Sequence, residues 1–182
     1  MSATNRGGER RKNDAYETPA WAIELLLENV PKPHRVFDPC AGNGALLRAA
    51  LRFGVPGTGI DIEPILEDEW AIRRIQRGNF LETPADQCGN ASCIIMNPPY
   101  SKALEFVQHA LRVAPVVHVL LRLGFLEGQA RGEWLSHNMP SHIRVLSKRP
   151  SFTGKGTDAA AYAWFTWEGY GRTESKTSIL MP

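Results

Sequence analysis

The chain has 182 residues, of which 43% are hydrophobic and 22% charged, proportions that suit one globular domain with a sizeable core. Its net charge of +2 permits contact with nucleic acid but excludes a strongly basic protein. The three cysteines lack the spacing of metal ligands, the N-terminus carries no apolar leader, and the longest apolar run is too short to cross a bilayer. We therefore expect a cytoplasmic protein with reduced thiols, no bound metal and no membrane contact.

Helix and strand signals alternate after a basic N-terminal stretch. Residues 1–13 are expected to form a disordered tail or one that grips phosphate, 14–170 the main domain, and 171–182 a short C-terminal tail. Thr18 reads as the cap of the first helix and Pro19 as its first helical residue. The pattern predicts helices over 18–30, 44–54, 65–78, 102–114 and 130–138, and strands within 35–44, 57–64, 78–82, 92–100, 115–123, 142–152 and 159–170.

This alternation predicts an α/β fold with a mostly parallel, seven-stranded sheet and helices on both faces. The last two strands have no helix between them, so we expect them to form an antiparallel hairpin at one edge. In such Rossmann-like sheets, ligands bind beyond the carboxyl ends of the strands, near the point where the strand order reverses. Residues that follow strands are therefore the candidates for function.

The first strand leads into the loop Phe-Asp-Pro-Cys-Ala-Gly-Asn-Gly, which carries Asp38, Gly42 and Gly44. Glycines let a backbone approach a ligand closely, although a glycine turn before a helix is often only a turn. Asp61 ends the next strand, where an acidic side chain can bind both hydroxyls of a ribose. Asp38 would repel a pyrophosphate and attract an α-amino group or a sulfonium. The loop therefore fits S-adenosylmethionine better than NAD or ATP.

The fourth strand is followed by Asn97-Pro98-Pro99-Tyr100. The side-chain carbonyl of Asn97 and the backbone carbonyl of Pro98 are two acceptors for an amino group, and the prolines hold them rigidly. Tyr100 offers a flat face to a planar ring. Together these residues would grip the exocyclic amine of an aromatic base and orient it toward a methyl group. The alternative interpretation is a rigid strand-to-helix turn.

With these motifs in that order, the chain resembles the class I S-adenosylmethionine-dependent methyltransferases. More narrowly, it resembles the γ-order N6-adenine DNA methyltransferases, over about residues 14 to 168. The family motifs are matched by "YETPAWAIELLLE", "FDPCAGNGAL", "GIDIEP", "GNFL" and "NPPY". The resemblance implies a methyltransferase sandwich that converts the cofactor to S-adenosylhomocysteine and flips an adenine out of double-stranded DNA.

The resemblance also implies roles for individual residues. The cofactor-binding residues would be Tyr16, Thr18, Pro19, Asp38, Pro39, Ala41, Gly42, Gly44, Asp61, Ile62, Asn79 and Phe80. The catalytic motif would be Asn97, Pro98, Pro99 and Tyr100, with Phe152 stacking on the flipped base opposite Tyr100; an ordinary core role for Phe152 is the alternative. Contacts to the nucleic-acid backbone would come from Lys102, Arg122, Arg131, Lys148, Arg149 and Lys155, which by default are scattered surface charges.

Two features depart from the family pattern. Position 79 is Asn where the family usually has Asp, although Asn can still accept a hydrogen bond from the cofactor's adenine amine. Only about a dozen residues follow the final predicted strand, where specific members carry a recognition domain. This implies relaxed or short-site specificity, a homodimer or a separate specificity partner. It also resembles compact enzymes of bacteriophages, and hence of a bacterial cell or phage-infected host.

Other functions stay open at the level of sequence. Motifs of this kind also serve adenine methylation in RNA and glutamine side-chain methylation in proteins. A non-catalytic module that binds cofactor or DNA is a third alternative, although both cofactor acids and the Asn97 motif are intact. The recognition sequence, the oligomeric state and the biological role, whether restriction, anti-restriction or regulation, are not specified by the sequence.

Overall fold

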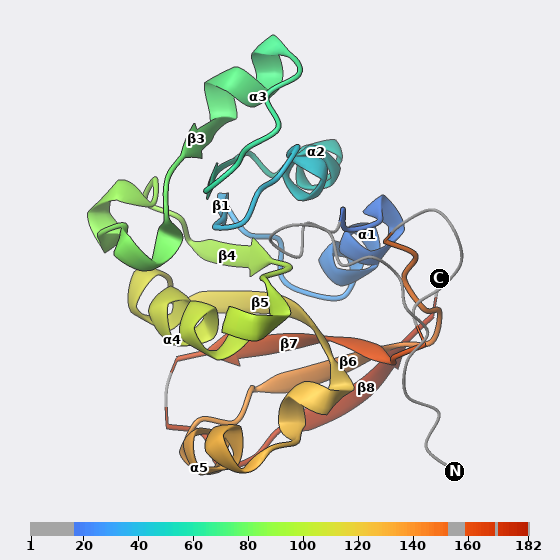
Figure 1. Ribbon diagram of the computed structural model, residues 1–182. Coiled ribbons are helices and arrows are strands. Elements are labelled where there is room, and N and C mark those ends of the chain that lie inside the picture. Colours follow the sequence, from blue (N-terminus) through green and yellow to red (C-terminus); the bar gives the residue numbers. More distant parts are fainter. Residues whose placement is uncertain (1–16, 153–158, 170, 182) are drawn as a thin grey trace.

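The computed structural model describes residues 17–152, 159–169 and 171–181. Within this part of the chain, eight strands form one sheet in the order β3-β2-β1-β4-β5-β7-β6-β8 (Figure 1). The strands are β1 (Val36–Asp38), β2 (Gly57–Asp61), β3 (Ile75–Arg77), β4 (Cys93–Met96), β5 (Val116–Arg122), β6 (His142–Leu146), β7 (Tyr162–Glu168) and β8 (Lys176–Leu180). The α-helices are α1 (Ala20–Glu28), α2 (Ala45–Arg52), α3 (Glu69–Arg74), α4 (Ala103–Val113) and α5 (Gln129–His137).

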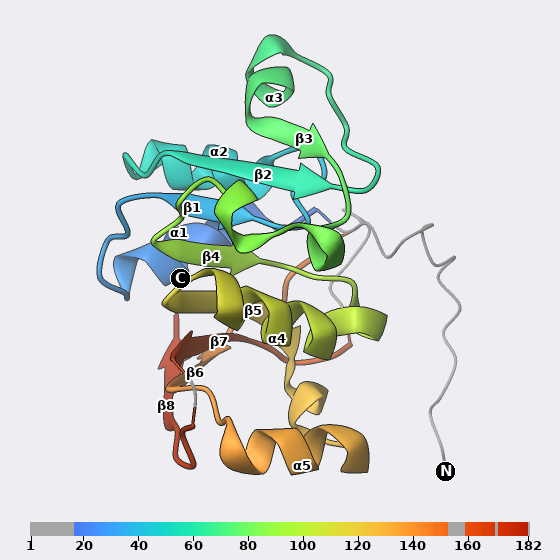
Figure 2. The same cartoon turned by 90° about the vertical axis from the view of Figure 1, so that its left-hand side faces the viewer.

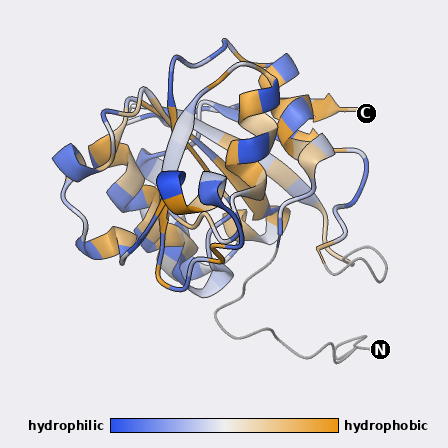
Figure 3. Cartoon of the chain, turned by 90° about the horizontal axis from the view of Figure 1, so that it is seen from above, coloured by the Kyte–Doolittle hydropathy of each residue, from blue (hydrophilic) through white to orange (hydrophobic). Residues whose placement is uncertain are grey.

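Each face of the sheet has its own hydrophobic core. The leucines and alanines of α1 and α2 pack on one face, together with Trp164 of β7 and Leu180 of β8. Phe106 and its neighbours in α4, with Leu135 of α5, pack on the other face against Phe165. Figure 3 shows apolar strands at the centre and helices with one polar side. Because both faces are covered, the strands between them are almost wholly apolar, as the sequence indicated.

Strands β1 to β5 pair with one another in parallel, so their carboxyl ends meet at one edge (Figure 2). β7 runs antiparallel to both β5 and β6. The predicted α/β fold with antiparallel C-terminal strands is therefore confirmed. The predicted helices over 44–54, 102–114 and 130–138 correspond to α2, α4 and α5.

The prediction of seven strands was wrong, because the sheet has an eighth strand within the expected C-terminal tail. β8 pairs in parallel with β6, from Lys176 opposite His142 to Leu180 opposite Leu146. It was missed because four of its five residues are exposed, which leaves only Leu180 as an apolar anchor. The β6–β7 pair consequently lies inside the sheet, and β8 forms the edge.

The region between β2 and β4 also differs from the prediction. The helix predicted over 65–78 begins at Glu69, since the Asp68 side chain accepts a hydrogen bond from the Ala71 amide and caps it there. It ends at Arg74, because Ile75 is extended and pairs with Gly59 as the first residue of β3. The strand predicted over 78–82 is instead a single 3-10 turn, η2 (Phe80–Glu82).

Candidate functional site

The predicted site residues converge where β1, β2 and β4 end. Asp38 is the last residue of β1, Asp61 the last of β2, and Asn97 follows β4 directly. Because β1 lies between β2 and β4 in a parallel arrangement, these three side chains share the carboxyl edge. This edge includes the reversal of strand order, the usual ligand position in such sheets.

Asp61 organises the glycine loop with both of its carboxylate oxygens. Oδ2 accepts a hydrogen bond from the Gly42 amide at 2.8 Å, and Oδ1 accepts one from the Glu63 amide at 2.9 Å. Gly42 has a φ of +52°, and no heavy atom lies within 4 Å of the position that a Cβ would take there. The loop is thus held open at Gly42, where a ligand can approach the backbone.

Gly44 has a different reason to be glycine. Its φ is +81°, and a Cβ would lie 2.8 Å from the Trp70 ring and 3.0 Å from the Ile75 side chain. It lies directly before α2, so the close approach of Trp70 packs the start of this helix. Gly42 therefore leaves space for a ligand, whereas Gly44 allows close packing.

Asp38 is 2% exposed, and its Oδ1 accepts a hydrogen bond from the Cys40 amide at 3.1 Å. Burial raises the pKa of the Asp38 carboxyl to about 7; the Cys40 amide opposes this rise and the Asp61 carboxylate adds to it. Among the described residues, no basic side chain forms an ion pair with Asp38. A cationic ligand group placed here would stabilise the ionised carboxylate.

Cys40 contacts both Asp38 and the backbone of Asn97. Burial raises the pKa of its thiol well above the usual value, and the carboxylates of Asp38 and Asp61 raise it further. The backbone amide of Asn97 acts in the opposite direction by donating to the sulfur. The thiol is therefore neutral, so it does not serve as a nucleophile, and it links the glycine loop to the backbone of Asn97.

Thr18 contacts Asn97 across 79 positions of sequence. The Asn97 side-chain amide donates a 3.1 Å hydrogen bond to the Thr18 hydroxyl, and Thr18 is 5% exposed. The prediction that Thr18 caps the first helix was wrong: α1 begins at Ala20, with Pro19 at its N-cap and no side-chain cap. The Thr18 hydroxyl instead accepts from the Asn97 amide nitrogen, and this bond fixes the orientation of the Asn97 side chain.

Other predicted cofactor residues lie around the same edge. Ile62 is 48% exposed beside Asp61 and presents an apolar surface. The Asn79 side chain accepts from the Leu81 amide and donates to the Glu82 carboxylate, while Phe80 is 1% exposed and packs in the core. Pro39 and Ala41 are buried in the glycine loop, and Tyr16 lies outside the described residues.

Tyr100 begins a 3-10 turn, η4 (Tyr100–Lys102), and is partly buried. Its hydroxyl hydrogen-bonds the hydroxyl of Tyr162 at 2.8 Å. Phe152, predicted to face Tyr100 across a bound base, is 9% exposed and packs on the Tyr162 ring, with centroids 5.1 Å apart. The structure thus places Tyr162 in contact with both aromatic candidates.

The predicted basic residues have different surroundings. Lys102, Lys148 and Arg149 are exposed close to the carboxyl ends of β4 and β6, and the Lys148 ammonium lies 5.1 Å from the Trp21 ring centroid. The Arg122 guanidinium lies 4.6 Å from the Tyr100 ring centroid. Arg131 instead donates to the backbone carbonyls of Gly124, Phe125 and Glu127, which gives it a structural role. Lys155 lies outside the described residues.

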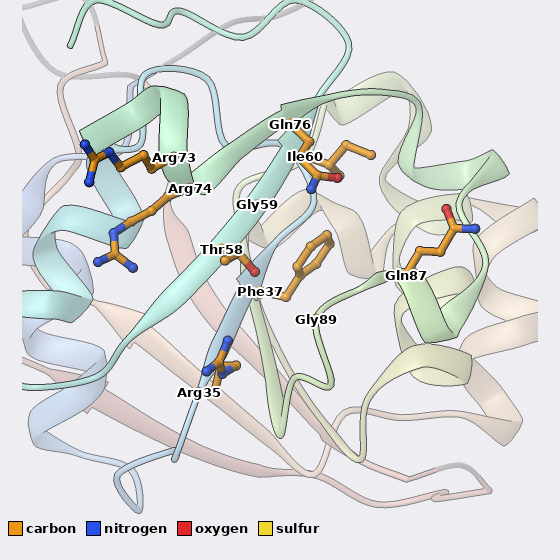
Figure 4. A pocket seen from close by; sticks show the side chains of 10 residues that line it. All are labelled: Arg35, Phe37, Thr58, Gly59, Ile60, Arg73, Arg74, Gln76, Gln87 and Gly89. Atoms are coloured by element: carbon orange, nitrogen blue, oxygen red, sulfur yellow. The ribbon is translucent and has the colours of Figure 1, made fainter. Parts of the chain in front are cut away.

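A cavity of about 170 Å³ opens away from this edge, along β1 and β2 (Figure 4). It contains none of the predicted site residues. Its lining consists of Arg35, Phe37, Thr58, Gly59, Ile60, Arg73, Arg74, Gln76, Gln87 and Gly89. In the described parts of the chain, no three His, Cys, Asp or Glu side chains gather as a metal site, and no helix is long and apolar enough to cross a membrane.

With the geometry established, comparison with solved structures shows what the fold resembles. The M protein of the type I restriction enzyme EcoKI matches with 18% identity and a TM-score of 0.62, over 88% of this chain and 46% of that one. A protein described as an RNA methyltransferase from Pyrococcus horikoshii matches with 18% identity and a TM-score of 0.62, over 93% and 94%. An RNA methyltransferase from Salinibacter ruber, in complex with S-adenosyl-L-homocysteine, matches with 16% identity and a TM-score of 0.51, over 82% and 92%.

The chain therefore has the Rossmann-like fold of the class I S-adenosylmethionine-dependent methyltransferases. It spans less than half the length of the type I modification subunits that it matches. No protein-family model and no curated protein matches the sequence. At these identities the likeness establishes the fold alone.

Sequence reasoning missed two residues at this site. Tyr162 begins a strand late in the chain, and nothing in its neighbourhood distinguishes it from other core aromatics. Cys40 was considered only for metal and disulfide chemistry, and its contact with Asn97 depends on the pairing of β1 with β4. The one local signal that could have drawn attention to Cys40 was the DPC sequence, which begins with the last residue of a buried strand.

Proposed function

We propose that this protein transfers a methyl group from S-adenosylmethionine to the exocyclic amine of adenine in DNA, leaving S-adenosylhomocysteine. The observation that carries the proposal is the Asn97–Thr18 hydrogen bond at the end of β4. It orients an amide carbonyl at the carboxyl edge, next to a glycine loop and two acids. The motif at Asn97 would thus supply an acceptor for an amine beside the glycine loop and the two acids proposed to bind the cofactor.

The cofactor fits the residues around the glycine loop. Asp38 would pair with the methionine amino group, a cation that stabilises its buried carboxylate. Asp61 would bind the ribose hydroxyls, with the adenine ring on the exposed side chain of Ile62. Gly42 leaves room for close approach of the cofactor to the backbone. S-adenosylmethionine, when bound, supplies an electrophilic methyl carbon on a sulfonium.

The catalytic motif would act on the amine of the substrate. Asn97 Oδ1 and the Pro98 carbonyl would accept hydrogen bonds from the two N–H groups of the substrate amine. These bonds would point the nitrogen lone pair at the methyl carbon. The bond from nitrogen to the methyl carbon would form as the carbon–sulfur bond breaks. The two acceptors would stabilise the positive charge that develops on nitrogen, and the amine would then release its proton to solvent.

The support for DNA comes from the order of the motifs and from the position of the basic residues. A Thr-Pro motif precedes the glycine loop, as in the γ-order DNA enzymes that the sequence resembles. Lys102, Lys148 and Arg149 lie near the same edge as Asn97, where they would meet phosphates. The likeness in length to the Pyrococcus RNA methyltransferase makes adenine in RNA the second candidate.

The experiment that tests the proposal measures labelled-methyl transfer to duplex DNA, single-stranded DNA and RNA in parallel, followed by mass analysis of the nucleosides. We expect N6-methyladenine in DNA. Label confined to RNA would overturn the proposed substrate and retain the chemistry. Tight cofactor binding without label in any nucleic acid would contradict the proposal and favour a protein substrate or a binding module.

A further inference from the structure

Tyr100 is held by two residues from neighbouring strands that the proposed mechanism does not yet use. Arg122 ends β5, Tyr162 begins β7, and the two are opposite each other in the antiparallel register. The Arg122 Nε–H donates to the Tyr162 hydroxyl at 2.9 Å. That hydroxyl in turn hydrogen-bonds the Tyr100 hydroxyl at 2.8 Å. The phenol of Tyr100 is thereby tied to the ends of β5 and β7, two inner strands of the sheet.

The Arg122 guanidinium also lies against the Tyr100 ring. The guanidinium carbon is 4.6 Å from the Tyr100 ring centroid and 5.9 Å from that of Tyr162. A planar cation at this distance is attracted to the face of an aromatic ring. Arg122 therefore restrains Tyr100 in two ways, by covering its ring and by donating to the hydroxyl that holds its phenol.

Tyr162 is suited to be the fixed point of this network. It is 1% exposed, and Phe152 packs on its ring with an interplanar angle of 60°. Its backbone lies in a strand with pairing partners on both sides. Tyr100, in contrast, lies on a short 3-10 turn, where its ring orientation depends on what it contacts. Tyr162 therefore fixes the orientation of the Tyr100 ring, and not the reverse.

We propose that Arg122 and Tyr162 are positioning residues that fix the plane of Tyr100 for stacking on the substrate base. The inference rests on the proposed function and deepens it. A flipped base gains from an aromatic surface that is already oriented, because no further freedom is lost when the base arrives. Arg122 thus acts through Tyr100, in place of the phosphate contact expected from the sequence, and Phe152 acts by supporting Tyr162.

The kinetic test compares Tyr162→Phe and Arg122→Gln with the wild-type protein. Tyr162→Phe removes both hydrogen bonds of the network and Arg122→Gln removes one of them, so kcat/KM for duplex DNA is expected to fall about three- to tenfold in each variant. The dissociation constant for S-adenosylmethionine is expected to stay the same, since neither residue contacts the glycine loop. Arg122→Lys is expected to behave like Arg122→Gln, because an ammonium lacks both the planar face and the Nε–H.

Two control variants make comparable changes elsewhere. Ser141→Ala removes a buried hydroxyl that donates to the Thr166 carbonyl, and Arg52→Gln removes a surface arginine paired with Glu24. Both are expected to retain the kcat/KM of the wild type. A Tyr162→Phe variant that also retains it, or that loses cofactor affinity to the same degree, would overturn the positioning role.

A second readout does not depend on activity. The Nε–H of Arg122 is expected to give an NMR resonance that is protected from exchange, assigned by its loss in Arg122→Lys, and absent in Tyr162→Phe. If the wild-type protein methylates no nucleic acid, the proposed function fails, yet this resonance still decides whether the network exists. A rapidly exchanging Nε–H in the wild type would overturn the inference.

Discussion

The two halves of the sheet hold their candidate site residues in different ways. In the half formed by β3, β2, β1 and β4, the strands are three to five residues long, and backbone amides donate to Asp38 and Asp61. In the half formed by β5, β7, β6 and β8, the strands are five to seven residues long, and β7 carries large aromatic side chains. Side chains there contact one another directly, as in the hydrogen bond from Arg122 to Tyr162.

This difference explains which half can be recognised in a sequence. A loop that binds a ligand through its backbone needs glycines and acids at fixed short spacings, and those spacings are visible as motifs. A network such as Arg122–Tyr162–Tyr100 joins residues 22 to 62 positions apart through strand register. We infer that the first half serves the cofactor and the second half the substrate, with Asn97 at the boundary.

The variant Asn97→Ala changes the residue between the two halves and is expected to have the largest effect on turnover. It removes the acceptor proposed for the amine but leaves Asp38, Asp61 and the glycine loop in place. Turnover is expected to fall by about a hundredfold or more, on the scale of losing one group that stabilises developing charge. Methyl transfer in single-turnover conditions measures the loss, and calorimetric titration is expected to show unchanged cofactor affinity. Turnover near that of the wild type would refute the acceptor role.

Asp61→Ala is expected to act on the cofactor half alone. The variant loses the carboxylate proposed for the ribose and the two bonds from the Gly42 and Glu63 amides. Affinity for S-adenosylmethionine is expected to fall by about ten- to a hundredfold. Equilibrium dialysis measures it, with circular dichroism to show that the fold persists. An unchanged dissociation constant would remove Asp61 from the site.

Much of the fold could be predicted because local pattern determines it, and so could the meeting of Asp38, Asp61 and Asn97 at one edge of the sheet. Thr18 was expected at the site and also as a helix cap, and only the contact with Asn97 separates the two roles. β8 was missed because an exposed edge strand lacks the apolar alternation by which strands are recognised. Tyr162 was missed because a buried tyrosine in a strand has the same sequence signature whether it supports the core or the site.

The ionisation of Asp38 is expected to make the stability of the protein depend on pH. Its pKa of about 7 in the folded protein lies above its usual value of 3.8. Its contribution to stability is therefore fully present below about pH 4 and is lost as the pH rises through about 7. Relative to the wild type, Asp38→Asn is expected to gain in Tm between pH 4 and pH 7 and to level off above it.

Cofactor affinity is expected to have the opposite dependence. Only the ionised Asp38 carboxylate pairs with an amino group, so the affinity of the wild type is expected to rise roughly tenfold between pH 6 and pH 8. The Asp38→Asn variant is expected to bind weakly and without this rise. A flat affinity profile in the wild type would show that Asp38 does not titrate on cofactor binding.

The smallest expected effect concerns the substrate half. Lys148 is exposed after β6, at the carboxyl edge, whereas Lys32 precedes β1 at the opposite edge. If DNA lies along the carboxyl edge, Lys148→Gln removes one phosphate contact and lowers the slope of log affinity against log salt by about 1. Fluorescence anisotropy with a labelled duplex, measured over a range of salt concentrations, gives that slope. Lys32→Gln makes the same change in charge and is expected to leave the slope unchanged. Equal slopes for both variants would place the nucleic acid elsewhere, because a net charge effect alone cannot distinguish the two edges.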